Sequence, residues 1–143
     1  MGDDLVLDAG VGIRILLEDQ PGHAQARDAF GAALKRGRRV LAPQLYLFEV
    51  GNVLARAQGK AERRAAALDA AHALVDVADL QPASFHRALS VAADGKLTFY
   101  DAAYLALAEQ QGGVLWTEDR EILKRFPART ADTQELLNRL AKE

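Results

Sequence analysis

The sequence predicts an α/β fold in which helices cover both faces of a parallel sheet. Two observations support this fold class. Short apolar runs with strand character recur along the chain, and they are separated by stretches whose apolar residues have helical spacing. Proline and glycine residues stand at many borders between the two kinds of segment. Strands that alternate with helices in this way are typical of parallel sheets with helices on both sides.

The expected elements follow one another without an internal repeat or a low-complexity linker. Pro43 suits the first turn of a helix, Gly37 and Gly59 suit helix ends, and Thr98 suits a helix start. We expect this order: strand 5–7, a helix through residues 13–17, helix 23–35, strand 40–42, helix 44–58, helix 62–75, a weak strand at 75–80, helix 83–93, a turn at 94–96, helix 99–111, strand 114–117, a short helix at 119–126, an edge strand at 128–130 and a terminal helix from residue 133.

The composition predicts a single domain over residues 1–143. Half of the residues are hydrophobic and 27% are charged, which argues against disorder and against a membrane protein. The N-terminus lacks the pattern of a signal peptide. The absence of cysteine excludes disulfides and thiolate zinc sites, and it fits a cytoplasmic protein. The net charge of −2 gives no overall attraction to nucleic acid, so RNA binding would need local basic patches.

Four acidic residues stand where an α/β chain would bring them toward one crevice. Asp8 ends the first strand, and Asp119 follows the strand at 114–117. Ligands of open α/β sheets bind beyond the carboxyl ends of the strands, so both side chains should face that region. Helices that enter the same region would bring Asp101, in a first helical turn, and Glu49.

Each of these residues also has a purely structural explanation. Asp8 and Asp119 suit helix N-caps, and Thr98 with Asp101 has the spacing of a capping box.

Glu49 lies in a stretch, residues 45–54, that is apolar almost all round, so we expect its side chain to be partly buried. A buried carboxylate needs a partner. An ion pair with Arg56 is the alternative to a shared metal.

A cluster of carboxylates predicts its own cation. Converging carboxylates repel one another and raise their pKa values. A divalent cation removes this penalty, and hard oxygen ligands select Mg²⁺, with Mn²⁺ also compatible. No histidine falls within these motifs, which argues against zinc.

Four motifs, in this order and spacing, resemble the PIN domain, and within it the VapC-like toxins of bacterial and archaeal toxin–antitoxin pairs. The motifs are LVLDA at residues 5–9, APQLYLFEVGN at 42–52, LTFYDAAYLALA at 97–108 and LWTED at 115–119. They cover nearly the whole chain, and the stretch YDAAYLALA is the most specific.

The resemblance implies a three-layer α/β/α sandwich with a short central parallel sheet. It also implies that the chain is a Mg²⁺-dependent endoribonuclease, the toxin of a toxin–antitoxin pair, which forms a homodimer and is neutralised by an antitoxin segment that fills the acidic groove. The family often has Ser or Thr two residues after its first Asp, whereas this chain has Gly10, so a hydroxyl that orients a ligand or water is lost. In the family, acidic residues hold the metal, and they match Asp8, Glu49, Asp101 and Asp119. A polar residue supports them in the family, and it matches Thr117.

RNA would have to reach this acidic chain through local positive charge. Arg120 directly follows Asp119 and Lys124 comes one turn later, close enough to hold phosphates beside a metal, and residues 35–39 and 56–64 contain further basic clusters. The alternative for each cluster is a solvated charged face. Glu118 is expected to face solvent.

Two other functions are compatible with parts of this pattern. A phosphoacceptor signalling domain also uses Mg²⁺ and acids at strand ends, but it would have an acidic pair after the first strand and a Lys after a late one. A non-catalytic module that binds RNA or protein is favoured by Gly10.

Overall fold

The structure is a computed structural model, and it describes residues 3–95 and 97–143. Within them no helix combines the length and the apolar content that a bilayer crossing requires. The elements in chain order are β1 (Leu5–Leu7), α1 (Ala9–Leu16), α2 (His23–Lys35), β2 (Val40–Ala42), α3 (Leu45–Arg56), α4 (Ala61–Ala73), β3 (Asp76–Val77), α5 (Pro82–Gly95), α6 (Phe99–Gln110), β4 (Val114–Trp116), α7 (Arg120–Arg125), β5 (Thr130–Ala131) and α8 (Thr133–Ala141).

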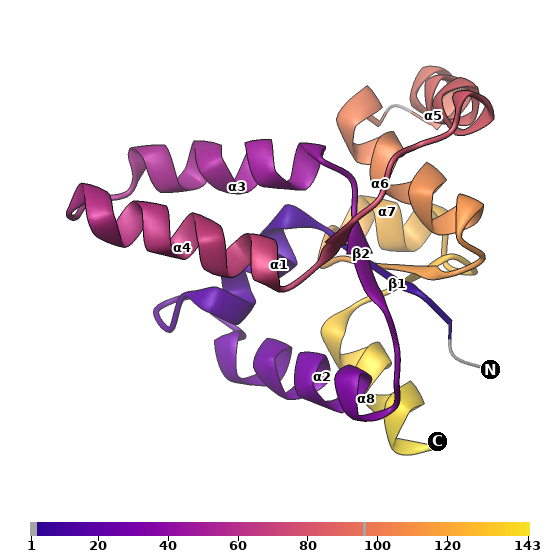
Figure 1. Cartoon of the computed structure of the whole chain (residues 1–143). Coiled ribbons are helices and arrows are strands. Elements are labelled where there is room, and N and C mark those ends of the chain that lie inside the picture. Colours follow the sequence, from indigo (N-terminus) through magenta and orange to yellow (C-terminus); the bar gives the residue numbers. More distant parts are fainter. Residues whose placement is uncertain (1–2, 96) are drawn as a thin grey trace.

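The five strands form one parallel sheet in the order β3-β2-β1-β4-β5 (Figure 1). β1 is central: Leu5 aligns with Val40 of β2 on one side, and Leu7 aligns with Trp116 of β4 on the other. All residues of β1 and β2 are buried, as expected for strands that are covered on both faces. The strand order changes direction between β1 and β4, and this is where open parallel sheets leave a crevice for ligands.

Helices cover both faces of the sheet, as the sequence predicted. α6 packs against β1 and β4 and carries α5 on its outer side, while α2 packs against α1 and α8. In Figure 1 the pair α5 and α6 lies above the sheet and the pair α2 and α8 below it. The buried stretch of α6, residues 102–108, anchors this helix firmly in the core. α3 and α4 pack together as an antiparallel pair that extends away from the sheet.

Several expected boundaries were wrong. Asp94 and Gly95 belong to α5 rather than to a turn, and Lys96, the third residue of that expected turn, lies outside the described residues. The edge strand comes later than expected, because Arg129 N bonds to Phe126 O and keeps residues 126–129 in a turn, so β5 begins at Thr130.

The other differences in boundaries are smaller. The weak strand at 75–80 is reduced to the two residues of β3, and α3 ends at Arg56 rather than at residue 58.

Candidate active site

Asp8 stands at the carboxyl end of β1 and is held by two hydrogen bonds. Its Oδ1 accepts from Val11 N at 2.8 Å, which makes Asp8 the N-cap of α1. Its Oδ2 accepts from the hydroxyl of Thr117, which follows β4 and is fully buried. The predicted capping role is therefore correct, and the same side chain also faces the crevice between β1 and β4.

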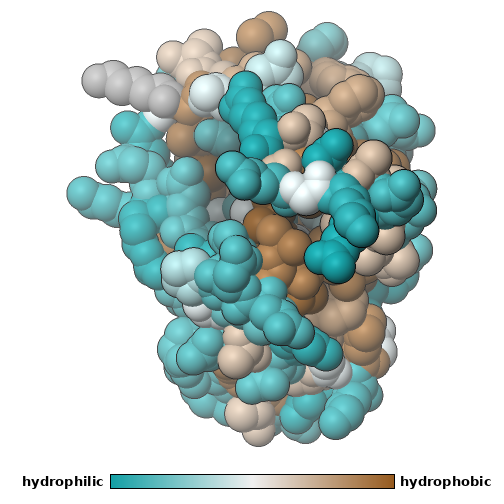
Figure 2. All heavy atoms as spheres, turned by 90° about the vertical axis from the view of Figure 1, so that its left-hand side faces the viewer, coloured by the Kyte–Doolittle hydropathy of each residue, from teal (hydrophilic) through white to brown (hydrophobic). Residues whose placement is uncertain are grey.

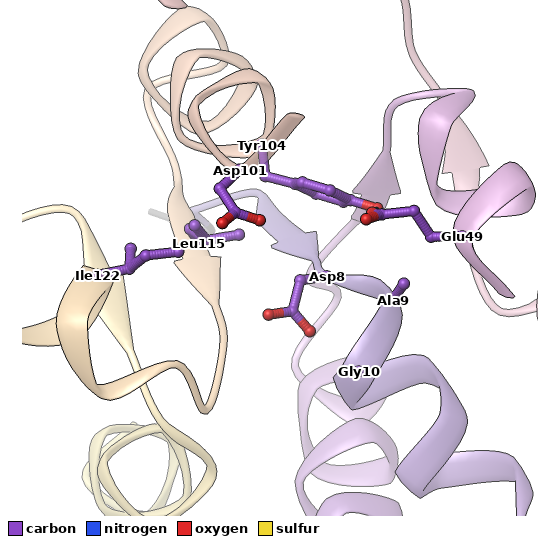
Figure 3. Close-up of a pocket in the computed structure, with 8 residues that line it drawn as sticks. All are labelled: Asp8, Ala9, Gly10, Glu49, Asp101, Tyr104, Leu115 and Ile122. Atoms are coloured by element: carbon purple, nitrogen blue, oxygen red, sulfur yellow. The ribbon is translucent and has the colours of Figure 1, made fainter. Parts of the chain in front are cut away.

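Glu49 and Asp101 reach the same place from two other elements. Glu49 projects from α3 and Asp101 from the first turn of α6, where Thr98 caps the helix. Both line a pocket of about 100 Å³ together with Asp8, and the three carboxylates surround it in Figure 3. Its lining residues are Asp8, Ala9, Gly10, Glu49, Asp101, Tyr104, Leu115 and Ile122.

Asp119 lies beside this pocket and does not line it. Its side chain caps α7, with Oδ1 accepting from Glu121 N at 3.0 Å and from Ile122 N at 3.2 Å. Its charge nevertheless reaches Asp101: burial raises the pKa of that carboxyl group, and the charge of Asp119 adds to the rise. Of the four predicted acids, three share one pocket and the fourth is their electrostatic neighbour.

The pKa values show that these acids share one electrostatic environment. Burial raises the pKa of Asp8 to about 6, against the favourable hydrogen bonds from Thr117 and Val11, and the charges of Glu49 and Asp101 add to the rise. Burial also raises the pKa of Glu49, and Asp101 adds to that shift. Negative charge is therefore costly in this pocket unless a cation offsets it.

The donor set of the pocket fits a hard divalent cation. Its acidic side chains offer anionic oxygens, which Mg²⁺ and Mn²⁺ prefer, and they come from three different elements. In the part of the chain that the structure describes, no three His, Cys, Asp or Glu side chains stand close enough to chelate one ion as they are. Chelation by three of them would therefore require side-chain movement, and the hydrogen bonds of Asp8 and Glu49 limit how far those two side chains turn.

Residues 5–128 match the sequence model of the PIN domain. The chain belongs to the PIN-domain family. Exonuclease VapC9 from Pyrobaculum aerophilum is 33% identical over 112 residues, which cover 77% of this chain and 84% of that protein. Ribonuclease VapC3 from the same organism is 51% identical over 41 residues, which are 29% of this chain and 31% of that protein. The family and the names of these relatives support a nuclease activity for this PIN domain.

Solved structures confirm the expected three-layer PIN fold. PAE2754 from Pyrobaculum aerophilum has a TM-score of 0.70 and 27% identity, with both chains covered completely. The VapBC2 structure from Rickettsia felis, bound to a DNA fragment from the promoter, has a TM-score of 0.72 at 12% identity and covers 90% of this chain and 97% of that one. At that identity the second likeness concerns the fold alone.

The structure does not support the alternative of an ion pair between Glu49 and Arg56. Among the described residues Glu49 forms no ion pair with Arg56; its Oε1 instead accepts a hydrogen bond from the hydroxyl of Tyr104. Tyr104 lies one turn after Asp101 on α6 and lines the pocket of this PIN domain. Sequence reasoning missed it, although its spacing of three residues from Asp101 places both on one helix face.

Thr117 and Gly10 lie beside different oxygens of the Asp8 carboxylate. Thr117 also accepts from Asp119 N at 3.1 Å, so its hydroxyl joins two of the four acids. Gly10 lines the pocket, and a Cβ built on it would lie 3.4 Å from Oδ1 of Asp8, which is an ordinary contact. A side chain thus fits at the position where the PIN family often has a hydroxyl.

The two expected phosphate-binding residues lie outside the pocket lining. The guanidinium of Arg120 pairs with Asp132 at 3.0 Å and with Glu118 at 3.4 Å, so two carboxylates already engage it. Lys124 is exposed on α7. The expectation that Glu118 faces solvent was wrong, because its Oε2 accepts from both the backbone N and the hydroxyl of Thr133, each at 2.7 Å.

Proposed function

We propose that this PIN domain is a Mg²⁺-dependent endoribonuclease and that Asp8, Glu49 and Asp101 hold its cation. The observation that carries the proposal is their convergence: three carboxylates from distant parts of the chain line one pocket at the switch point of the sheet. The family match and the two VapC-named relatives support the choice of a nuclease. Asp119, beside the pocket, is proposed as a further ligand or as part of a second metal position.

The chain's own residues would prepare this pocket for a phosphodiester. Asp8 is fixed by Thr117 and by the first turn of α1, so one ligand is held in place before a cation arrives. Without a cation, the charge of these acids repels the phosphates of RNA. A bound cation supplies Lewis-acid stabilisation of the phosphate charge and lowers the pKa of an attacking water. Lys124, exposed on α7, is proposed to attract the RNA backbone, as is Arg120 if it leaves its acidic partners.

We further propose that the protein is a toxin that a cognate antitoxin neutralises in the cytoplasm. The names of the relatives support this role. α1 contributes both to the acidic pocket and, at its other end, to a groove of about 430 Å³ that Ile15, Leu16, Phe30 and Leu74 line in part. Figure 2 faces this end of the molecule and shows hydrophobic residues exposed between hydrophilic ones. An antitoxin segment would cover the groove and the pocket.

A homodimer is proposed on a second apolar surface. The side chains of Phe85, Leu89 and Tyr100 are 48%, 61% and 61% exposed, and Phe48 on α3 is 69% exposed. Phe85 and Tyr100 also line a pocket of about 270 Å³. Exposed apolar side chains gathered at a pocket mark an interaction surface, and we propose that Phe48 and Leu89 belong to it. Phe48→Ser with Leu89→Ser should yield a monomer in sedimentation measurements, whereas an unchanged mass would reject this interface.

The activity is tested with protein stripped of metal by EDTA. RNA cleavage should return with Mg²⁺ or Mn²⁺, and it should be abolished by Asp8→Asn and by Asp101→Asn. Asp28→Asn is the matched control, because this exposed aspartate on α2 is no part of the pocket. Cleavage of a circular RNA distinguishes an endonuclease from an exonuclease, since a circle has no end. Intact RNA with the metal-loaded wild type, across varied substrates, would reject the proposal.

A non-catalytic binding module is the second candidate, and Gly10 favours it by leaving the pocket without the hydroxyl that the family often has there. RNA that is bound at micromolar protein concentration and stays intact with either metal would favour this candidate.

A further inference from the structure

Tyr104 connects two sides of the acidic pocket, which are formed by α6 and α3. Its ring is buried with 3% of its surface exposed, and its hydroxyl donates to Oε1 of Glu49 (Figure 3). Tyr104 belongs to α6, in the core, whereas Glu49 belongs to α3, which packs against α1 and α4. Across the described chain, this is the one hydrogen bond that connects α3 to α6.

Glu49 needs such a partner more than the other acids of the pocket do. Asp8 is short, stands at the end of β1 and has each of its oxygens in a hydrogen bond. Glu49 has one more methylene, starts from a helix outside the sheet layer and is only half-buried. The hydroxyl of Tyr104 occupies Oε1 and leaves Oε2 free of any protein hydrogen bond among the described residues.

We propose that Tyr104 is a positioning residue that holds Glu49 in the pocket with one oxygen free to bind the cation shared with Asp8 and Asp101. The inference rests on the proposed metal-dependent nuclease and goes beyond it by assigning a role to a neutral side chain. Hydrogen bonds that orient a ligand from outside the coordination shell typically contribute 10-fold to 100-fold to metal affinity or activity. Tyr104 itself contributes no charge and binds no metal in this account.

The test compares Tyr104→Phe with Tyr46→Phe. Tyr46 is also a buried tyrosine, but its hydroxyl donates to Ala71 O at 2.9 Å and joins α3 to α4, and no hydrogen bond links it to a carboxylate among the described residues. Both variants lose one buried hydroxyl, so damage to packing or stability should be similar. Mn²⁺ binding to the metal-free protein is measured by the electron paramagnetic resonance signal of free Mn²⁺, independently of activity.

We expect Tyr104→Phe to weaken Mn²⁺ binding about 10-fold or more, and Tyr46→Phe to leave it within about twofold of wild type. Cleavage by Tyr104→Phe should recover when Mn²⁺ is raised, since the ligands are still present. Glu49→Asp shortens the side chain out of reach of the tyrosine, so adding Tyr104→Phe to it should cause no further loss of affinity.

Equal Mn²⁺ affinity of Tyr104→Phe and wild type would overturn the positioning role, as would an equal loss in the Glu49→Asp background. Wild-type protein that binds Mn²⁺ without cutting RNA would overturn the proposed nuclease alone, because the binding comparison still stands. Wild-type protein that binds no Mn²⁺ would overturn both.

Discussion

Replacing Asp8 by Asn should stabilise the metal-free protein while it destroys the activity. Asn is about as good a helix cap as Asp. Its amide oxygen can still accept from Val11 N, and its amide nitrogen can donate to the hydroxyl of Thr117. The replacement therefore removes mainly the charge, whose burial raises the pKa of Asp8 from 3.8 to about 6. A pKa difference of this size corresponds to about 3 kcal/mol of unfolding free energy.

The pH dependence of this gain has a definite sign. The pKa of Asp8 is higher in the folded protein than in the unfolded chain. The free energy of unfolding of the wild type is therefore reduced only at pH values where the unfolded chain has lost this proton. The penalty is absent below pH 3.8, grows between pH 3.8 and about 6, and is complete above that. Asp8→Asn should therefore match wild type at pH 3.5 and exceed it at pH 7.5.

Thermal unfolding in EDTA measures this difference. We expect a Tm about 5–10 °C higher for Asp8→Asn at pH 7.5, and saturating Mg²⁺ should close the gap by stabilising the wild type alone. Asp28→Asn, which removes an exposed charge on α2, should change Tm little at either pH. A less stable Asp8→Asn, or a difference that does not vary with pH, would refute the idea that this carboxylate is held in the fold for a cation.

Three further results are expected. Thr117→Val keeps the buried shape of the side chain but leaves Oδ2 of Asp8 without its hydrogen-bond donor. It should lower the free energy of unfolding by about 1–3 kcal/mol in chemical denaturation and weaken Mn²⁺ binding about 10-fold. Unchanged Mn²⁺ affinity would contradict the supporting role. Gly10→Ser should be at least as stable as wild type, because a Cβ has room there and Gly is a poor helix residue. Its cleavage rate should equal or exceed that of wild type. A lower Tm or slower cleavage would show that the pocket does not accommodate a side chain. Lys124→Ala should raise the KM for RNA and reduce the salt dependence of RNA binding by about one unit of slope. Arg120→Ala should have a smaller effect on both, because acidic partners already engage its guanidinium. A larger effect of Arg120→Ala would show that RNA displaces those carboxylates from Arg120.

The sequence predicted the parts of the site that depend on local order along the chain. Asp8 could be placed because an apolar run ends directly before it, and Asp101 because Thr98 marks the start of its helix. Parallel strands end at a common edge, so the convergence of these residues follows from the topology. Glu49, which no strand end indicates, stood out because it is the one carboxylate in the apolar stretch at residues 45–54.

What the sequence did not predict depends on contacts between distant residues. Arg56 lies on the same face of α3 as Glu49, but two turns of helix separate them by about 10 Å, too far for a close pair. Tyr104 sits in a run of apolar residues, where a tyrosine looks like part of the core until its hydroxyl is traced to α3. Glu118 accepts hydrogen bonds from Thr133, which lies 15 residues later in the chain but beside it in the fold.

The most direct test of the shared cation is a crystal structure of the protein soaked in Mn²⁺, examined by anomalous scattering. The account predicts a peak in the pocket between β1 and β4, with oxygens of Asp8 and of at least one of Glu49 and Asp101 about 2 Å from it. A fully occupied Mn²⁺ bound elsewhere, or a pocket that stays empty at saturating Mn²⁺ while the protein cuts RNA, would contradict the account.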